Sequence, residues 1–387
     1  MTVVQIDRRR QPLASFQSNW GTLEEVAHHH ERRAASVRPR IEYGAGPELV
    51  EGFIERMRAE STALLSPSLD AGCYAPAVRP KRDYKGSIMR TGSGRFTYEL
   101  VPGWAKIPPH ISTGWIGGVV SDRHGRVYCF GRGTHPMLVF DREGSLVDHW
   151  GDTFVSHAHG AFIDDEEQLW LTDRFAQVVW VCDTAGRVLR KVGLLHIRST
   201  DDDYHMKGDP PPGEPPRFDG FNHPTNTHLA ADGTVFISDG YRAAKCHRFS
   251  VAGVIEKSWG SPGSGPGQFD LPHGIWVTRD DRVLVADREN SRVQVFTRDG
   301  EFQAEWTGLH RPTNLYVDEE ADAIYVAQLD GRVSVLDLDG TRITQLGEPG
   351  TGPGQFGAPH DVWIDDQGAL YVCEVQRANR LHKFVPV

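Results

Sequence analysis

The sequence predicts an all-β fold: a six-bladed β-propeller preceded by a partly helical N-terminal extension. Three observations support this prediction. One unit recurs with a period of roughly 40 residues along most of the 387-residue chain. Each copy holds about four short runs rich in Val, Ile, Leu, Tyr and Trp, separated by turns such as Asp-Gly. Six copies are present, and six four-stranded blades close a ring.

The copies can be laid out in order along the chain, and we number them as blades one to six. They span about residues 115–151, 157–193, 222–260, 271–308, 310–347 and 358–387. The sixth copy is one strand short, which would leave an exposed strand edge. Phe96–Val101 alternates between apolar and polar residues, so we predict that it supplies the missing outer strand. The propeller is therefore predicted to cover residues 96–387.

Residues 1–95 form the extension, for which the sequence predicts two helices. Thr22-Leu-Glu-Glu25 is a capping box that opens a helix toward Ala35, and residues 47–65 carry one apolar stripe. His28–His30 could bind a metal, but consecutive residues do not share a helix face, so a solvated helix end is the preferred interpretation. The sequence leaves open whether the extension is a lid, a dimer contact or a brace.

The composition argues against several classes of partner. The net charge is −10 and no Lys/Arg cluster forms a nucleic-acid groove, so no nucleic-acid partner is expected. No apolar run reaches transmembrane length, and the N-terminus lacks the apolar segment of a signal peptide. The five cysteines show no paired spacing and are predicted to be free thiols in a reducing compartment, the cytoplasm.

The six copies can be aligned at the loop that ends in proline, which brings equivalent residues into register. We call the residue after that proline, or its equivalent where the proline is missing, position zero. In blade order, position zero is occupied by Gly117, His159, Thr225, His273, Thr313 and His360. Fourteen residues later four copies have an acidic residue, among them Asp239 and Asp287, which either belong to the site or only brace strand ends. The histidines therefore occur in alternate blades.

Position zero opens the innermost strand, beside the central channel. Alternate blades of a six-bladed ring are one third of a turn apart, so His159, His273 and His360 are predicted to converge on the axis. Three His ligands with a free fourth position form a catalytic zinc arrangement. The alternative is three solvated loop histidines, which the constant register disfavours.

Polar residues that follow the second strand of a blade are predicted to lie on the same face as the histidines. They are Arg132, Arg174, Tyr241 and Arg288. Three arginines beside a metal are costly unless they serve a function. A tyrosine next to a cation can act as a base. The long Pro-rich connection Leu194–Phe221 emerges on this face, and we expect it to form a wall or lid.

Several motifs resemble a known family. Pro266-Gly-Gln-Phe269, Pro272-His273 and Ala286–Arg292 resemble NHL-repeat propellers. With Ser238-Asp-Gly-Tyr241 and Pro359-His360-Asp361, the region from Phe96 onward resembles the peptidyl-α-hydroxyglycine α-amidating lyases. NHL repeats alone are common and mostly bind proteins or nucleic acid, so the histidine positions together with Tyr241 make the second resemblance the more specific one.

The resemblance implies a set of site residues. His159, His273 and His360 would hold zinc, Tyr241 would be the catalytic tyrosine and Arg132 would pair with it. Arg288 would bind a substrate carboxylate in a bidentate manner, and Arg174 is a further candidate for substrate binding. A structural calcium ion in the channel would be bound by the Asp361 side chain and by the backbone carbonyls of Val119 and Ala161.

The sequence also departs from that family. Ala358 replaces a methionine near the zinc, Arg242 replaces a disulfide cysteine, and no export signal is present. We therefore expect a zinc-dependent lyase that cleaves a carbinolamide to an amide and an aldehyde such as glyoxylate. The departures allow a small N-acyl hemiaminal in place of a peptide.

Two other functions are compatible with the same scaffold. The first is another metal-dependent lyase or hydrolase on the same scaffold, such as a lactonase. The second is a non-catalytic NHL binding module. Six-bladed lactonases tend to use Asp, Asn and Glu at calcium sites, and a pure scaffold gives no reason for histidines in alternate blades.

Overall fold

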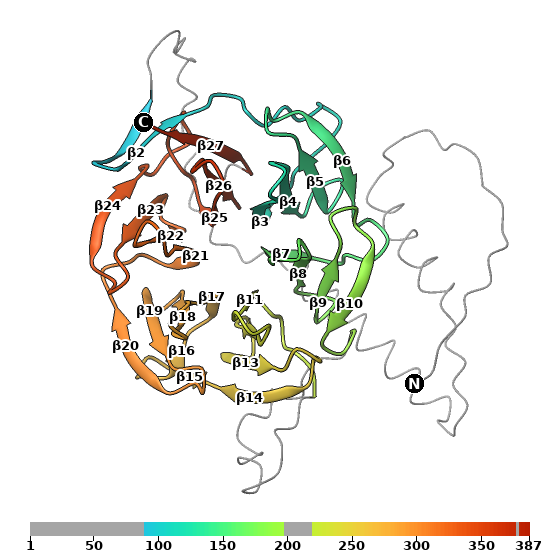
Figure 1. The fold of residues 1–387 in the computed structure, drawn as a ribbon, viewed down its shortest axis with the longest axis vertical. Helices are drawn as coiled ribbons and strands as arrows, with labels where there is room; N and C mark the ends of the chain where they lie inside the picture. The colour runs from blue at the N-terminus through green and yellow to red at the C-terminus, as the bar shows by residue number, and fades with distance from the viewer. Residues whose placement is uncertain (1–88, 197–218, 377–378) are drawn as a thin grey trace, which may run out of the picture. The chain divides into compact units, whose positions relative to one another are not determined.

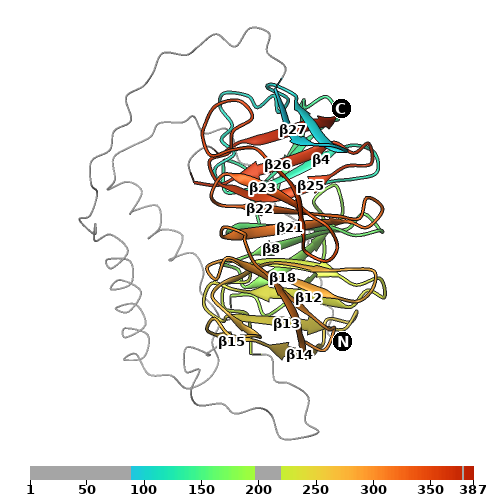
Figure 2. The same ribbon diagram turned by 90° about the vertical axis from the view of Figure 1, so that its left-hand side faces the viewer.

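The computed structural model describes residues 89–196, 219–376 and 379–387. All regular secondary structure in these residues is β-strand, arranged as six blades around a central axis (Figure 1). Figure 2 shows the same blades from the side. The prediction of an all-β, six-bladed propeller is confirmed. The predicted helices at 22–35 and 47–65, His28–His30 and most of the connection 194–221 lie outside the described residues.

Each blade is an antiparallel sheet whose strands follow one another from the channel outward. Blade one has β3 (Ile116–Ser121), β4 (Val127–Gly131), β5 (Met137–Phe140) and β6 (Leu146–Trp150), and blade two has β7 (Ala158–Ile163), β8 (Leu169–Asp173), β9 (Val178–Cys182) and β10 (Val188–Val192). Blade three has β11 (Asn226–Leu229), β12 (Val235–Asp239), β13 (Lys245–Phe249) and β14 (Ile255–Trp259), and blade four has β17 (Pro272–Val277), β18 (Val283–Asp287), β19 (Arg292–Phe296) and β20 (Phe302–Trp306). Blade five has β21 (Pro312–Asp318), β22 (Ala323–Gln328), β23 (Arg332–Leu336) and β24 (Arg342–Leu346). A short parallel pair, β15 (Ser261–Pro262) and β16 (Gln268–Phe269), precedes blade four.

Blade six closes the ring with strands from both ends of the propeller. It contains β25 (Pro359–Ile364), β26 (Leu370–Glu374), β27 (Leu381–Pro386), β2 (Phe96–Leu100) and β1 (Arg90–Ser93). β2 pairs antiparallel with β27, with Leu100 opposite Phe384, so the predicted closing strand is confirmed. β1 adds a fifth strand that the sequence did not predict. Its four residues are mostly exposed and carry no apolar alternation.

The hydrophobic core lies between blades and repeats around the ring. Six apolar clusters each join two neighbouring blades. Tryptophans at the ends of outer strands pack against a turn glycine of the next blade, as Trp150 does on Gly186 and Trp306 on Gly340. Both glycines have positive φ, and a Cβ atom at either would collide with the indole ring. Apolar burial thus repeats at each interface between neighbouring blades.

Two further expectations can be compared with the structure. Cys129, Cys182, Cys246 and Cys373, the cysteines within the described residues, are free and buried in strands. Across the same residues, no helix has the length and apolar character that a membrane span requires.

Candidate metal centre

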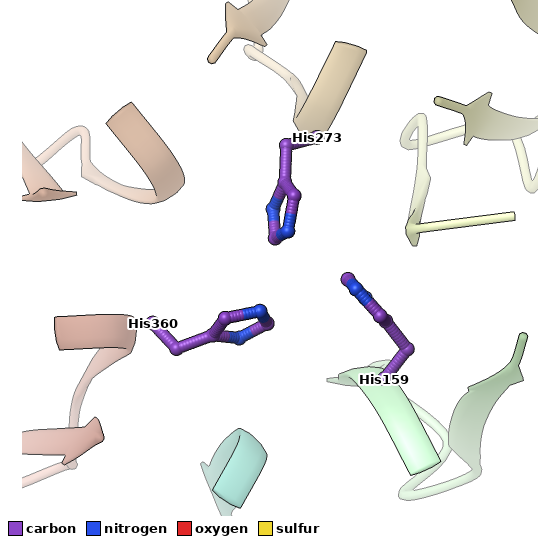
Figure 3. Close-up of side chains that lie close together, drawn as sticks. All are labelled: His159, His273 and His360. Carbon is purple, nitrogen blue, oxygen red and sulfur yellow. The ribbon is translucent and has the colours of Figure 1, made fainter. Parts of the chain in front are cut away.

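The three position-zero histidines meet at the channel axis. His159, His273 and His360 lie near the starts of β7, β17 and β25 and point toward one another from three directions (Figure 3). Their rings are buried, and one nitrogen from each lies within 4.8 Å of the others. The sequence register thus placed three residues 114 and 87 positions apart in one cluster (159 to 273 and 273 to 360). A buried group of this kind could hold a metal ion.

A backbone carbonyl of the following blade fixes the tautomer of each imidazole. His159 Nδ1 lies 2.7 Å from the Thr225 oxygen, His273 Nδ1 2.6 Å from the Thr313 oxygen, and His360 Nδ1 2.8 Å from the Gly117 oxygen. A carbonyl only accepts, so Nδ1 carries the proton in each ring. Each Nε2 is therefore left with a lone pair, the form in which histidine binds metal.

The position-zero residues without imidazoles thus complete the site, a role that the sequence analysis missed. The signal was present, because Gly117, Thr225 and Thr313 occupy the same register position in the intervening blades. Thr225 Oγ1 lies 2.9 Å from the Pro272 oxygen and Thr313 Oγ1 3.1 Å from the Pro359 oxygen, next to the following histidine in each case. A Cβ atom on Gly117 would collide with the His159 backbone, so glycine is required for this close approach.

Burial is the main influence on the protonation of the three imidazoles. It lowers the pKa of His360 to about 3, with the Arg132 charge acting in the same direction. Burial, followed by the neighbouring histidines and arginines, lowers the pKa of His159 and His273 well below the ordinary value. All three rings are therefore neutral near pH 7, as metal ligation requires. His273 Nε2 has no hydrogen-bond partner among the described residues.

The residues fourteen positions beyond position zero hold the loops that carry the histidines. Asp173 accepts hydrogen bonds from the backbone N–H groups of Ser156 and His157, and Glu374 from that of Ala358. Asp239 and Asp287 bind the backbone N–H groups of Asn222 and Asp270 in the same way. These carboxylates brace the strand ends by accepting backbone hydrogen bonds. Of the two interpretations offered for Asp239 and Asp287, the structure agrees with bracing of strand ends.

Tyr241 lies beside the histidine cluster. Its hydroxyl oxygen is 3.0 Å from His159 Nε2, and Arg288 Nη1 donates to the same oxygen at 3.4 Å. The Arg174 guanidinium stacks on the tyrosine ring, 3.6 Å from its centroid. The phenol oxygen therefore lies beside the candidate metal position and the Arg288 charge, and the Arg174 charge lies over the ring.

Arg132 approaches the site without a hydrogen bond to Tyr241. Its Nε donates to the Ala158 carbonyl at 2.8 Å, and its Nη2 is buried without a partner among the described residues. Burial lowers the pKa of Arg132 to about 10, and Tyr241 opposes that shift. The structure thus brings Arg132 into the electrostatic environment of Tyr241 but does not show the direct pair that the resemblance implies.

Asp361 directly follows His360 in β25 and is also buried. Its carboxylate accepts the backbone N–H groups of Val119 at 3.0 Å and Val362 at 2.8 Å, and the side-chain amide of Asn314. Asn314 in turn accepts from Asn226 at 2.7 Å. Burial raises the pKa of Asp361 to about 7.

The calcium site implied by the resemblance falls at this carboxylate. Ala161 lines the same small pocket as Asp361, so Asp361, Val119 and Ala161 are brought together as expected. The contact with Val119 is through its N–H group, and calcium binding stays a prediction. Aromatic rings of Phe162, Trp276, Tyr316 and Trp363 follow next, with neighbouring centroids 5.1–6.2 Å apart.

Comparison with known proteins agrees with this architecture. The NHL repeat family matches residues 269–296, which cover β17–β19 of blade four. The chain is a six-bladed propeller with NHL-repeat character. Human NHL repeat-containing protein 3 is 26% identical over 317 residues, which cover 76% of this chain and 85% of the relative.

Amidating enzymes are also among the relatives. The peptidylglycine alpha-amidating monooxygenase of Rattus norvegicus is 26% identical over 333 residues, 76% of this chain and 32% of the relative. Peptidyl-alpha-hydroxyglycine alpha-amidating lyase 1 of Drosophila melanogaster is 26% identical over 274 residues, 62% of this chain and 47% of the relative. The chain thus spans less than half of either protein, and the resemblance to this family extends over most of the propeller.

Solved structures show the same fold at low sequence identity. A gluconolactonase from Xanthomonas campestris superposes with a TM-score of 0.54 at 14% identity and covers 78% of this chain and 96% of its own. A virginiamycin B lyase from Staphylococcus aureus gives a TM-score of 0.50 at 14% identity, with coverage of 71% and 96%. At these identities the comparison establishes the fold.

Proposed function

We propose that this chain is a zinc-dependent lyase that cleaves the N–C bond of a carbinolamide and releases an amide and an aldehyde. The observation that carries the proposal is the tripod of neutral imidazoles with the Tyr241 hydroxyl 3.0 Å from one of its Nε2 atoms. The similarity to amidating lyases supports the same reaction class. For an α-hydroxyglycine substrate the aldehyde is glyoxylate.

The metal is proposed to be zinc, held by His159, His273 and His360. Three neutral imidazoles in a buried site are a donor set typical of catalytic zinc, with a fourth position free for substrate. Bound there, zinc would act as a Lewis acid toward an oxygen of the substrate. The carbonyls of Gly117, Thr225 and Thr313 hold the ring orientations that this requires.

The protein residues have separate tasks in the reaction. Tyr241, acting as the base, takes the proton of the substrate hydroxyl, and the substrate oxygen becomes the carbonyl of the aldehyde as the C–N bond breaks. The bonding electron pair stays on nitrogen, and the proton held by Tyr241 is returned to that nitrogen, which leaves as a primary amide. No electrons are gained or lost. The positive charges of Arg288 and Arg174 stabilise the negative charge that develops near Tyr241 during this transfer.

The substrate is proposed to be a small molecule with a carboxylate next to the carbinol carbon. Arg288 reaches the Tyr241 hydroxyl, so a carboxylate bound by its guanidinium lies beside the reacting hydroxyl group. Arg132 offers a buried Nη2 without a partner among the described residues at the same face. Both arginines can therefore orient the substrate by charge-assisted hydrogen bonds.

The test is release of glyoxylate from N-benzoyl-α-hydroxyglycine by the full-length chain purified with its metal. Elemental analysis of the same sample should give about one zinc per chain. Zinc with no aldehyde release from a panel of carbinolamides would favour another metal-dependent lyase or hydrolase. Absence of metal would favour a non-catalytic NHL module, the alternative suggested by similarity to a relative named only for its repeats.

A further inference from the structure

Positive charge around Tyr241 exceeds what a single substrate carboxylate would balance. Arg132, Arg174 and Arg288 surround this residue. Glu289 pairs with Arg288 at 2.7 Å, but the same carboxylate also pairs with Arg311 at 2.8 Å. Within the described residues, no carboxylate pairs with Arg132 or Arg174. A metal ion held by neutral imidazoles would add further positive charge.

Arg174 occupies a different place from Arg288. Arg288 reaches the hydroxyl end of Tyr241, while the Arg174 guanidinium lies over the face of the tyrosine ring. Arg174 also lies 5.3 Å from the ring centroid of Phe175, whose side chain is 46% exposed. The two guanidiniums therefore present donors at separate points along one side of the site.

Arg174 is poorly compensated in this position. Its Nε is buried and has no hydrogen-bond partner among the described residues. Burial lowers the pKa of Arg174, Tyr241 opposes this shift, and the charges of Arg288 and Arg242 act in the same direction as burial. A partly buried cation among other cations costs free energy unless an anion binds to it.

We propose that Arg174 binds a second anionic group, carried on the acyl side of the substrate. The proposal rests on the lyase function proposed above and narrows its substrate class. The substrate is then an N-acyl-α-hydroxyglycine with one carboxylate at the carbinol carbon, bound near Arg288, and an anionic group on the acyl portion, bound at Arg174. The reaction is unchanged, and its products are glyoxylate and an amide that keeps the anionic group.

Substrates of one shape and different charge test this proposal. N-(4-carboxybenzoyl)-α-hydroxyglycine and N-(4-carbamoylbenzoyl)-α-hydroxyglycine differ by a carboxylate and its neutral isostere. We expect kcat/KM for the carboxylate to exceed that for the amide by about tenfold or more. Arg174→Gln should bring the ratio of the two values close to one. Arg190→Gln is the matched control. Arg190 lies in the outer strand β10 and stacks on Trp170, so its substitution should leave the ratio unchanged.

The ratio of the two kcat/KM values shows whether Arg174 recognises the substrate or only positions Tyr241. If Arg174→Gln lowers kcat/KM equally for both substrates, Arg174 only positions the tyrosine and the proposal is wrong. A ratio near one in the unmodified protein would overturn it as well. Circular dichroism and zinc content of Arg174→Gln show whether the variant is folded and loaded.

A binding measurement distinguishes failure of this proposal from failure of the lyase function. If none of the substrates releases glyoxylate, the proposed lyase function is wrong. Titration calorimetry with the non-reacting 4-carboxybenzoylglycine and 4-carbamoylbenzoylglycine then decides whether Arg174 binds an anionic group. Preference for the carboxylate that is lost in Arg174→Gln supports the second anion subsite. Equal binding of the two compounds, or binding of neither, contradicts it.

Discussion

The carbonyl oxygen of Thr225 accepts a hydrogen bond from His159 Nδ1 at 2.7 Å across the boundary between blades two and three. The same relationship joins blade four to five and blade six to one. Each imidazole is thus oriented by a neighbouring blade, and the histidine cluster depends on correct closure of the whole ring.

Removing one imidazole should remove the metal. In His273→Ala two ligands remain, and zinc content should fall from about one per chain to a small fraction of that value. Inductively coupled plasma spectrometry on the purified protein measures this. His110→Ala changes an exposed histidine outside the cluster and should retain the metal. Full zinc occupancy in His273→Ala would show that the tripod is not the binding site.

The variant Tyr241→Phe distinguishes the role of the phenol oxygen from that of the ring. The ring and its contact with Arg174 are kept, while the oxygen beside His159 Nε2 is lost. We expect kcat for carbinolamide cleavage to fall by about 10²-fold or more, with zinc content and melting temperature retained. Tyr316→Phe, whose ring packs against Trp276 and Trp363, is the control. Turnover of Tyr241→Phe near the unmodified rate would assign the base to another group.

Gly117→Ala should disturb the site through the backbone alone. The added Cβ atom collides with the backbone of His159, and Gly117 also supplies the carbonyl that orients His360. Overpacking of this kind costs about 1–3 kcal/mol, so urea denaturation should show a lower unfolding free energy. Metal affinity, measured by chelator competition, should fall at least several-fold. Gly265→Ala, in a loop before blade four, provides the control.

Asp361→Ala should lower stability more than it lowers metal content at the histidines. The carboxylate links blade six to blade one through the N–H group of Val119, and its loss leaves buried donors without an acceptor. Each such donor costs about 1–3 kcal/mol. Calorimetric melting with and without a calcium chelator measures both effects. Unchanged melting of Asp361→Ala would contradict the structural role, and a chelator effect absent from this variant would support a calcium ion there.

The metal-free protein should lose stability as the pH falls from about 6.5. The three histidines have folded-state pKa values below the unfolded value, near 3 for His360, so the unfolded chain binds more protons than the folded protein in this range. The unfolding free energy therefore decreases toward acid, by up to about 1.4 kcal/mol per pH unit for each histidine. Urea titrations at pH 7.5 and 5.0 test this, and His360→Gln should reduce the slope. An equal slope in that variant would show that His360 does not contribute.

The sequence by itself determined the repeat, the number of blades and the register of the histidines. These follow from local patterns, because alternation of apolar residues and the spacing of Pro-His are written into each copy. The closing strand at Phe96 could also be predicted, since an incomplete blade and an alternating segment complement each other. The fifth strand β1 could not, because its pairing with β2 leaves no pattern in four mostly exposed residues.

Only the tertiary structure decided how the site residues are oriented. The tautomer of each imidazole depends on a carbonyl from the next blade, and the register places the residue that carries this carbonyl but not the direction in which the carbonyl points. The stacking of Arg174 on Tyr241 joins residues 67 positions apart (174 to 241) and depends on the angle between two blades. The register could place these side chains on one face of the ring. Packing between the blades set the distances and the environment that give them their chemistry.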